Sequence, residues 1–294
     1  MKNHIQGVIA AIITPVNLNG EVDLTRLVGI AEHLLQNGCS ALNLLGTTGE
    51  ATSLSVAQRS AVMQHVADAG LPLDRFMVGT GASATADAVH LTQLAARLGF
   101  AGALVLPPFY YKNVTEEGVM NYFDSIVRAT YAPSIPIYLY NFPALSGVAF
   151  TTNLTNRLLE NFGDRIAGLK DSSGDLPYAR EIAGLKKGFR VFPSNEAILM
   201  EARKGQFSGC ISATANITAQ HCAAAYNDGD EVALESAVRV RNLFAGIPLV
   251  PSIKALMGEL FCDQQLVNTL PPLAPISQAE IQELLSRYND VHSN

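Results

Sequence analysis

The sequence predicts a closed barrel of eight parallel strands surrounded by helices, a (β/α)8 TIM barrel in the α/β class, with a C-terminal helical extension. Eight short, nearly continuous apolar segments recur along the chain, and each ends in small or polar residues. This pattern is typical of parallel strands that are covered on both faces. Helical stretches alternate with these segments, and eight alternations favour a closed barrel. An open doubly wound sheet is less favoured, because no glycine-rich phosphate loop follows the first segment.

The expected strands and helices can be placed in order. The apolar segments cover residues 7–15, 40–50, 75–83, 102–110, 136–143, 166–173, 189–196 and 209–216. Helical stretches between them include residues 23–36, 56–69, 84–98, 116–129 and 195–203. Thr115 is a candidate N-cap, and glycines lie just past four helical runs, at positions 38, 70, 99 and 205. These residues are common start and stop signals of helices.

The part of the chain after the eighth strand reads as helical. Residues 219–245, residues 251–259 and a last segment from Gln278 have helical character, and a proline-rich connection precedes the last one. A separate domain would need a core of its own. We therefore predict a barrel over residues 1–220 and a helical extension over residues 221–294 that packs on it.

Composition limits the possible functions. The chain has 294 residues, 48% of them apolar, and a formal net charge of −6 without a basic stripe, which disfavours a nucleic-acid partner. The four cysteines have neither zinc-site nor disulfide-framework spacing. The N-terminal apolar run is only about eight residues long and lacks a cleavage site, so it reads as a strand and not as a signal peptide or membrane span. We expect a cytoplasmic protein with no membrane partner.

Two strand ends carry residues that suggest covalent catalysis. Lys170 closes one apolar segment, and Tyr140 closes the segment before it. In parallel barrels the chemistry takes place at the C-terminal ends of the strands, so both side chains should face one cleft. Burial disfavours the charged form of an amine and favours the nucleophilic one. The combination predicts Schiff-base chemistry on a carbonyl substrate, whereas a lysine that extends to solvent beside a packing tyrosine is the alternative.

Other strand-end residues suit the same task. Gly46, Thr47 and Thr48 follow the second strand, where hydroxyls and backbone N–H groups can bind a carboxylate next to the carbonyl. An ordinary strand-to-helix turn is the alternative for this segment. Tyr140 is placed to move a proton on the carbonyl or aldehyde oxygen. Ser194 and Glu196, after the seventh strand, are candidates for binding substrate hydroxyls, although they can equally be an N-cap and a first helical turn.

The strand ends contain no histidine. The six histidines fall in helices or at the termini, at positions 4, 33, 65, 90, 221 and 292. An imidazole-bound metal is therefore disfavoured, and we expect neither a metal nor a separate cofactor.

Five motifs occur in an order that identifies a family resemblance. They are Gly46-Thr47-Thr48-Gly49-Glu50, Pro107-Pro108-Phe109-Tyr110-Tyr111, Tyr140-Asn141-Phe142-Pro143, Gly168-Leu169-Lys170-Asp171 and Ile211-Ser212-Ala213-Thr214-Ala215-Asn216. From about residue 6 to residue 220 the chain resembles the dihydrodipicolinate synthase and N-acetylneuraminate lyase family of pyruvate-dependent class I aldolases. The resemblance is weaker in the C-terminal part.

The resemblance implies a role for each matching residue. Lys170 corresponds to the lysine that forms the imine, and Tyr140 to the proton donor and acceptor. Thr47 resembles the relay hydroxyl, and Thr48 the carboxylate ligand. The residue with its backbone against the pyruvate moiety corresponds to Ile211. One further residue, Tyr110, is similar to a relay tyrosine that enters the neighbouring subunit's site, which implies a homo-oligomer, commonly a tetramer built as a dimer of dimers.

The substrate of the reaction is less determined. The synthases usually carry an arginine two residues after the Tyr-Asn-x-Pro motif, and this chain has Leu145 there. Leucine cannot pair with the carboxylate of aspartate semialdehyde. We therefore expect a lyase that acts on a hydroxylated 2-oxo acid, sugar-acid-like or neuraminate-like, with an aldehyde as the second partner. Dihydrodipicolinate synthesis is the alternative, and a barrel that only binds a 2-oxo acid is a remote one.

Overall fold

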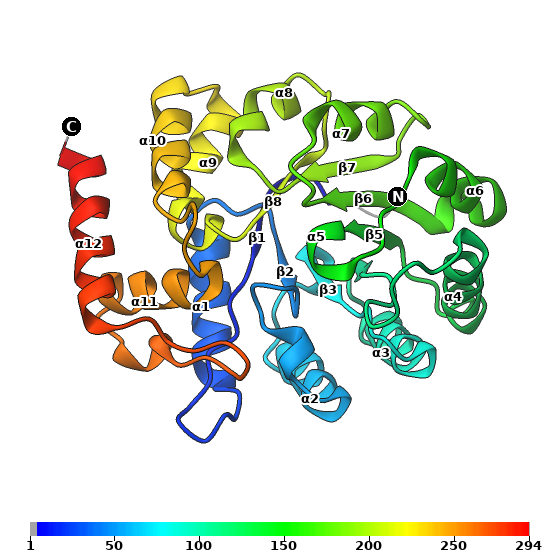
Figure 1. Ribbon diagram of the computed structural model, residues 1–294, viewed down its shortest axis with the longest axis horizontal. Coiled ribbons are helices and arrows are strands. Elements are labelled where there is room, and N and C mark those ends of the chain that lie inside the picture. The colour runs from blue at the N-terminus through cyan, green and yellow to red at the C-terminus, as the bar shows by residue number, and fades with distance from the viewer. Residues whose placement is uncertain (1–4, 294) are drawn as a thin grey trace.

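The computed structural model describes residues 5–293 and confirms the predicted barrel. Eight parallel strands stand side by side around a central axis, and helices surround them (Figure 1). The strands are β1 (Gly7–Ala11), β2 (Ala41–Leu44), β3 (Phe76–Gly79), β4 (Gly102–Val105), β5 (Ile137–Asn141), β6 (Ile166–Asp171), β7 (Arg190–Pro193) and β8 (Gly209–Ser212). Their order in the sheet runs from β7 back to β1 and then to β8. Each hydrogen-bonded pair of neighbouring strands is parallel.

The barrel is nearly closed at its last seam. Strands β7 and β8 lie next to each other, and the backbone N–H of Ser208 donates to the carbonyl of Val191 at 3.0 Å. Because the strands are parallel and adjacent, their C-terminal ends all meet at one mouth of the barrel.

Helices follow the strands as the sequence predicts. They are α1 (Leu24–Gln36), α2 (Val56–Asp68), α3 (Thr85–Leu98), α4 (Glu116–Ala129), the short α5 (Pro143–Ser146), α6 (Thr152–Phe162), α7 (Leu176–Ala183) and α8 (Leu199–Arg203). Thr115 accepts a hydrogen bond from the N–H of Gly118 and is the N-cap of α4, as expected. The predicted helix over residues 195–203 begins instead with a 3-10 turn, Glu196–Ile198, before α8.

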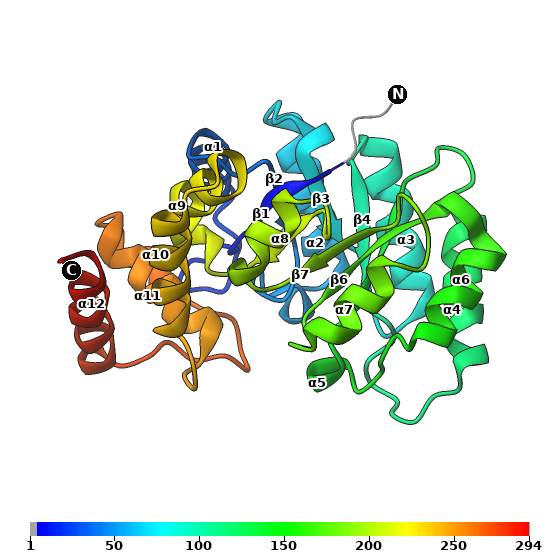
Figure 2. The ribbon, with the colours of Figure 1, turned by 90° about the horizontal axis from the view of Figure 1, so that it is seen from above.

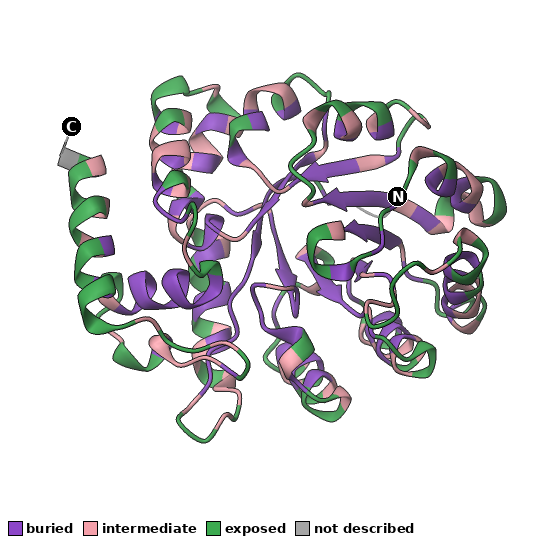
Figure 3. Cartoon of the chain, in the orientation of Figure 1, coloured by how far each residue is buried: buried purple, intermediate pink, exposed green. Residues whose placement is uncertain are grey.

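Two apolar cores hold the barrel together. One lies inside it and contains side chains such as Ile9, Met77, Tyr138 and Phe192. The other lies between the outer faces of the strands and the helices and continues into the extension, where it includes Met257. Figure 3 shows the result, with buried strands and helices whose outer faces are exposed. The strands therefore read as continuous apolar runs because both of their faces are covered.

The C-terminal part lies against one side of the barrel (Figure 2). It contains α9 (Ala215–Asp228), α10 (Glu231–Asn242), α11 (Leu249–Leu260) and α12 (Gln278–Ser293). The helical stretch predicted over residues 219–245 is two helices, because Gly229 has a φ of 76° and Asp230 caps the second one. Residue 220, at which we place the end of the barrel, lies within α9.

No helix within residues 5–293 combines the length and the apolar character needed to span a bilayer.

Candidate active site at the C-terminal ends of the strands

Lys170 and Tyr140 lie together at the mouth of the barrel. They are register partners on β6 and β5, and each is only 4% exposed. The Lys170 amine lies 4.3 Å from the centre of the Tyr140 ring. The Tyr140 hydroxyl is 3.2 Å from the hydroxyl of Thr47. A buried amine, a phenol and a second hydroxyl therefore lie in a row. The two hydroxyl groups can pass a proton from one to the other beside the amine.

The next residue on each strand fixes this pairing from the outer side. Asn141 and Asp171 are also register partners, and the Asn141 amide donates to the Asp171 carboxylate at 2.8 Å. Ser173 donates to the same carboxylate at 2.9 Å. Burial raises the pKa of Asp171, and the hydrogen bonds from Asn141 and Ser173 oppose this rise. This buried link joins β5 and β6 at the level of Tyr140 and Lys170, and therefore holds the two side chains in register.

The Gly46-Thr47-Thr48-Gly49 loop follows β2. Thr47 is half-buried, whereas Gly46 and Thr48 are buried. Residues with positive φ lie on either side of the loop, since Leu45 and Glu50 both have a φ of 53°. The loop therefore has a specific, constrained shape.

The tyrosines after β4 extend away from this cluster. Tyr110 and Tyr111 are each 74% exposed, and their rings pack edge to face with centroids 5.3 Å apart. Such exposure of two adjacent aromatic rings is unusual for a surface that faces only water.

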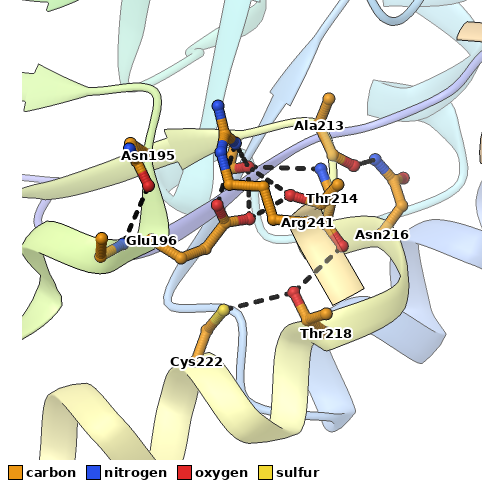
Figure 4. Close-up of polar contacts among 10 residues, drawn as sticks. Asn195, Glu196, Ala213, Thr214, Asn216, Thr218, Cys222 and Arg241 are labelled. Atoms are coloured by element: carbon orange, nitrogen blue, oxygen red, sulfur yellow. Dashed lines mark hydrogen bonds and ion pairs between the residues drawn. The ribbon is translucent and has the colours of Figure 1, made fainter. Parts of the chain in front are cut away.

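Glu196, expected as a candidate for binding substrate hydroxyls, is in contact with other side chains of the protein. Its side chain is fully buried, and its carboxylate accepts hydrogen bonds from Ser212 at 2.6 Å and from Thr214. Arg241 of α10 pairs with it at 2.9 Å (Figure 4). Glu196 starts a 3-10 turn, and its carboxylate is held by three side chains of the protein.

The remaining predicted residues lie at or near the mouth. Ser194 is half-buried directly after β7, and its N–H donates to the carbonyl of Asp171 at 2.8 Å. Ile211 is fully buried on β8. Leu145 is 57% exposed on α5, directly after β5. Within residues 5–293 the histidines lie in helices, and no group of three possible metal ligands occurs. His4 lies outside the described residues.

Two side chains were missed by the sequence analysis. Lys112 donates from its amine to the carbonyls of Phe109 and Ser146, the latter at 3.0 Å, and so links the segments after β4 and β5. Asn43 is fully buried on β2, on the inward face that it shares with Ala11, and its amide has no hydrogen-bond partner among the described residues. A signal existed for each, since Lys112 follows the Tyr110-Tyr111 pair and Asn43 is a polar residue within an apolar run.

A buried lysine amine beside a phenol at neighbouring strand ends of a parallel barrel is suited to Schiff-base chemistry on a carbonyl compound. Comparison with known proteins gives the family. The Dihydrodipicolinate synthetase family profile matches residues 4–289. The chain belongs to this family and is a lyase within it.

Three similar proteins illustrate the relationship. An uncharacterized DapA-like lyase of Chloroflexus aurantiacus is 31% identical over 97% of both chains. The 4-hydroxy-tetrahydrodipicolinate synthase of Methanococcoides burtonii is 32% identical over 96% of both chains. Among solved structures, dihydrodipicolinate synthase from Agrobacterium tumefaciens has a TM-score of 0.91 and 26% identity, and the match covers 98% of this chain and 99% of that one.

Proposed function

We propose that the protein catalyses carbon–carbon bond cleavage or formation through an imine between Lys170 and a 2-oxo acid, with pyruvate as one product or substrate. The observation that carries the proposal is the contact between the buried Lys170 amine, the Tyr140 ring and the Thr47 hydroxyl. The covalent imine takes the place of a separate cofactor. Four free cysteines support a cytoplasmic setting.

The steps follow from these three groups. The Lys170 amine adds to the 2-oxo carbon, and loss of water gives the protonated imine. In the cleavage direction the Tyr140 oxygen, which has given its proton to the departing water, takes the proton of the C4 hydroxyl. The C3–C4 bond breaks, and an aldehyde leaves. The bond electrons remain as an enamine, which gains a proton at C3, and water then releases pyruvate from Lys170. Thr47 and Thr48, with the N–H groups beside Gly46, hold the carboxylate throughout.

We infer that the substrate is a hydroxylated 2-oxo acid. The carrying observation is that Leu145, which is apolar and exposed at the mouth, stands where the synthases have arginine. Ser194, half-buried after β7, is the hydroxyl that we propose for substrate binding. Lys112 favours the second candidate, dihydrodipicolinate synthesis. Its ammonium donates to the carbonyls of residues 109 and 146, has no carboxylate partner among the ion pairs of residues 5–293, and can pair with a substrate carboxylate.

A substrate panel with two variants separates these candidates. Aspartate semialdehyde should be a poor partner for pyruvate, since losing a charge-assisted hydrogen bond costs about 1.5–3 kcal/mol, or more than tenfold in kcat/KM. Leu145→Arg should raise synthase activity and lower cleavage of hydroxylated 2-oxo acids. If the unmodified enzyme instead prefers aspartate semialdehyde and Lys112→Met removes that preference, the second candidate replaces the first.

We also propose that Tyr110 completes the proton relay of a neighbouring subunit in a homo-oligomer, a tetramer built as a dimer of dimers. Its 74% exposure in the single chain supports this, because an exposed ring pair is suited to a subunit contact.

Subunit mixing tests the relay across subunits. Tyr110→Phe should lower kcat less than Tyr140→Phe does, because it removes only a relay hydroxyl. Mixing Tyr110→Phe with Lys170→Ala should restore activity after subunit exchange, because one site of a mixed dimer is then intact. The same experiment with Tyr111→Phe is the matched comparison. If mass spectrometry demonstrates subunit exchange but no activity returns, Tyr110 acts in the site of its own chain.

A further inference from the structure

Two buried glutamates at strand ends pair with cations of the C-terminal extension. Glu50, which directly follows the Thr47-Thr48-Gly49 segment, pairs with Lys254 of α11, and both side chains are fully buried. Glu196 after β7 pairs with Arg241 of α10. Both helices contact α9 at the side of the barrel (Figure 1). The extension therefore reaches the ends of two strands that carry the proposed site.

The contacts around Glu50 are the more complete. Its carboxylate accepts from the Lys254 amine and, at 2.6 Å, from the backbone N–H of Leu270. Lys254 also donates to the carbonyl of Thr14 at 2.9 Å. The Thr14 hydroxyl in turn donates to the carbonyl of Gly49 at 2.7 Å. The extension thus holds the end of the loop at two successive residues, directly at Glu50 and through Thr14 at Gly49.

The backbone of the loop requires such a restraint. Glu50 and Leu45 have positive φ, which is unfavourable for an ordinary L-residue. A conformation of this kind persists where the surroundings over-determine it. The ion pair and the Leu270 hydrogen bond fix Glu50 from outside the loop, so that the loop residues themselves remain available to a ligand.

Stability alone does not account for this pair. Burial lowers the pKa of Lys254, and the Glu50 carboxylate opposes that shift. The desolvation of two charges offsets much of their attraction, so a buried ion pair contributes little net stability compared with apolar residues of similar volume. Such a pair does fix the relative position of the two side chains, because a buried charge without its partner is strongly unfavourable.

We propose that Lys254 is a positioning residue of the active site, which through Glu50 fixes the loop that binds the carboxylate of the 2-oxo acid. Catalysis then depends on the C-terminal extension, although no atom of Lys254 touches the substrate. The inference rests on the proposed function, and it adds a role for a part of the chain that the reaction itself does not use.

The test uses Lys254→Met and Glu50→Gln, which keep side-chain size and remove one charge each. We expect each variant to need at least about tenfold more pyruvate for half-maximal trapping by sodium borohydride, because small displacements of binding groups have large effects on rate. The double variant should unfold at nearly the wild-type temperature, since its buried charges are removed together, and it should still need more pyruvate. The factor by which the double variant raises the pyruvate concentration for half-maximal trapping should be smaller than the product of the factors for the two single variants.

The matched control is Arg26→Gln. Arg26 of α1 pairs with Asp263 of the extension at 2.6 Å and also with Asp23, and these side chains are partly exposed. The Arg26→Gln substitution should leave the pyruvate concentration for half-maximal trapping unchanged. If a single variant fails to fold, Thr14→Val tests the same connection without burying a charge, since it removes only the bond to Gly49.

Two outcomes separate this inference from the proposed function. If the Lys254→Met variant or the double variant folds and needs no more pyruvate than the wild-type protein, Lys254 has no positioning role. If the wild-type protein itself traps no pyruvate, the proposed function fails, and hydrogen exchange decides the positioning role. Amides of residues 45–51 should then exchange faster in Lys254→Met than in Arg26→Gln. Equal exchange in the two variants would contradict the inference.

Discussion

Lys170→Ala should abolish turnover, with a loss of about 10⁴-fold or more in kcat, because the variant lacks the amine that forms the imine. The fold should remain, since Lys170 lies at the open end of the barrel and contributes no ion pair there among those of the described residues. Steady-state kinetics and thermal unfolding measure the two effects. Lys170→Met, which restores the length of the side chain, should be equally inactive.

Trapping locates the reacting lysine. Pyruvate with sodium borohydride should add a reduced pyruvyl group to Lys170 and inactivate the enzyme, and peptide mass spectrometry should find no adduct in Lys170→Ala. Lys254 is a useful internal comparison, because it is also buried but is paired with Glu50. An adduct on Lys254, or no adduct at all, would contradict the proposed chemistry.

Tyr140→Phe should lower kcat by about 10²–10⁴, the usual range for loss of a general acid or base. The substitution keeps the ring that lies 4.3 Å from the Lys170 amine and removes only the hydroxyl 3.2 Å from Thr47. Borohydride trapping at Lys170 should therefore persist on long incubation with pyruvate, while turnover falls.

Tyr138→Phe is the matched control for that experiment. Tyr138 lies on the same strand and faces into the barrel, and burial raises the pKa of its hydroxyl. It should change kcat little. An equal loss in both variants would mean that any change inside the barrel disturbs the site, and Tyr140 would then lose its assigned role in proton transfer.

The barrel could be predicted because each of its strands is encoded locally. Runs such as residues 7–13 and 166–169 are apolar throughout, since both faces of a parallel strand are covered. The closeness of Lys170 and Tyr140 could be predicted in the same way, because adjacent parallel strands end at the same edge of the sheet. The break between α9 and α10 was missed, although Gly229 and Asp230 are visible signals, because the helical pattern continues on both sides.

The role of Glu196 could not be predicted in this way. Its position after β7 is compatible with a ligand at the mouth, and only the packing of α10 brings Arg241 to its carboxylate. A helix lying against the barrel thus decides whether a strand-end carboxylate is free or occupied.

The eight strands, the strand ends with Lys170, Tyr140 and Thr47, and the family resemblance could all be predicted, because they depend on short segments and on their order. The residues that support the site from outside depend on how distant parts of the chain pack together. Glu50 and Lys254 are 204 residues apart, and no local pattern in the sequence relates them. Their contact exists because α11 packs against the barrel wall, where two charges removed from water must meet each other.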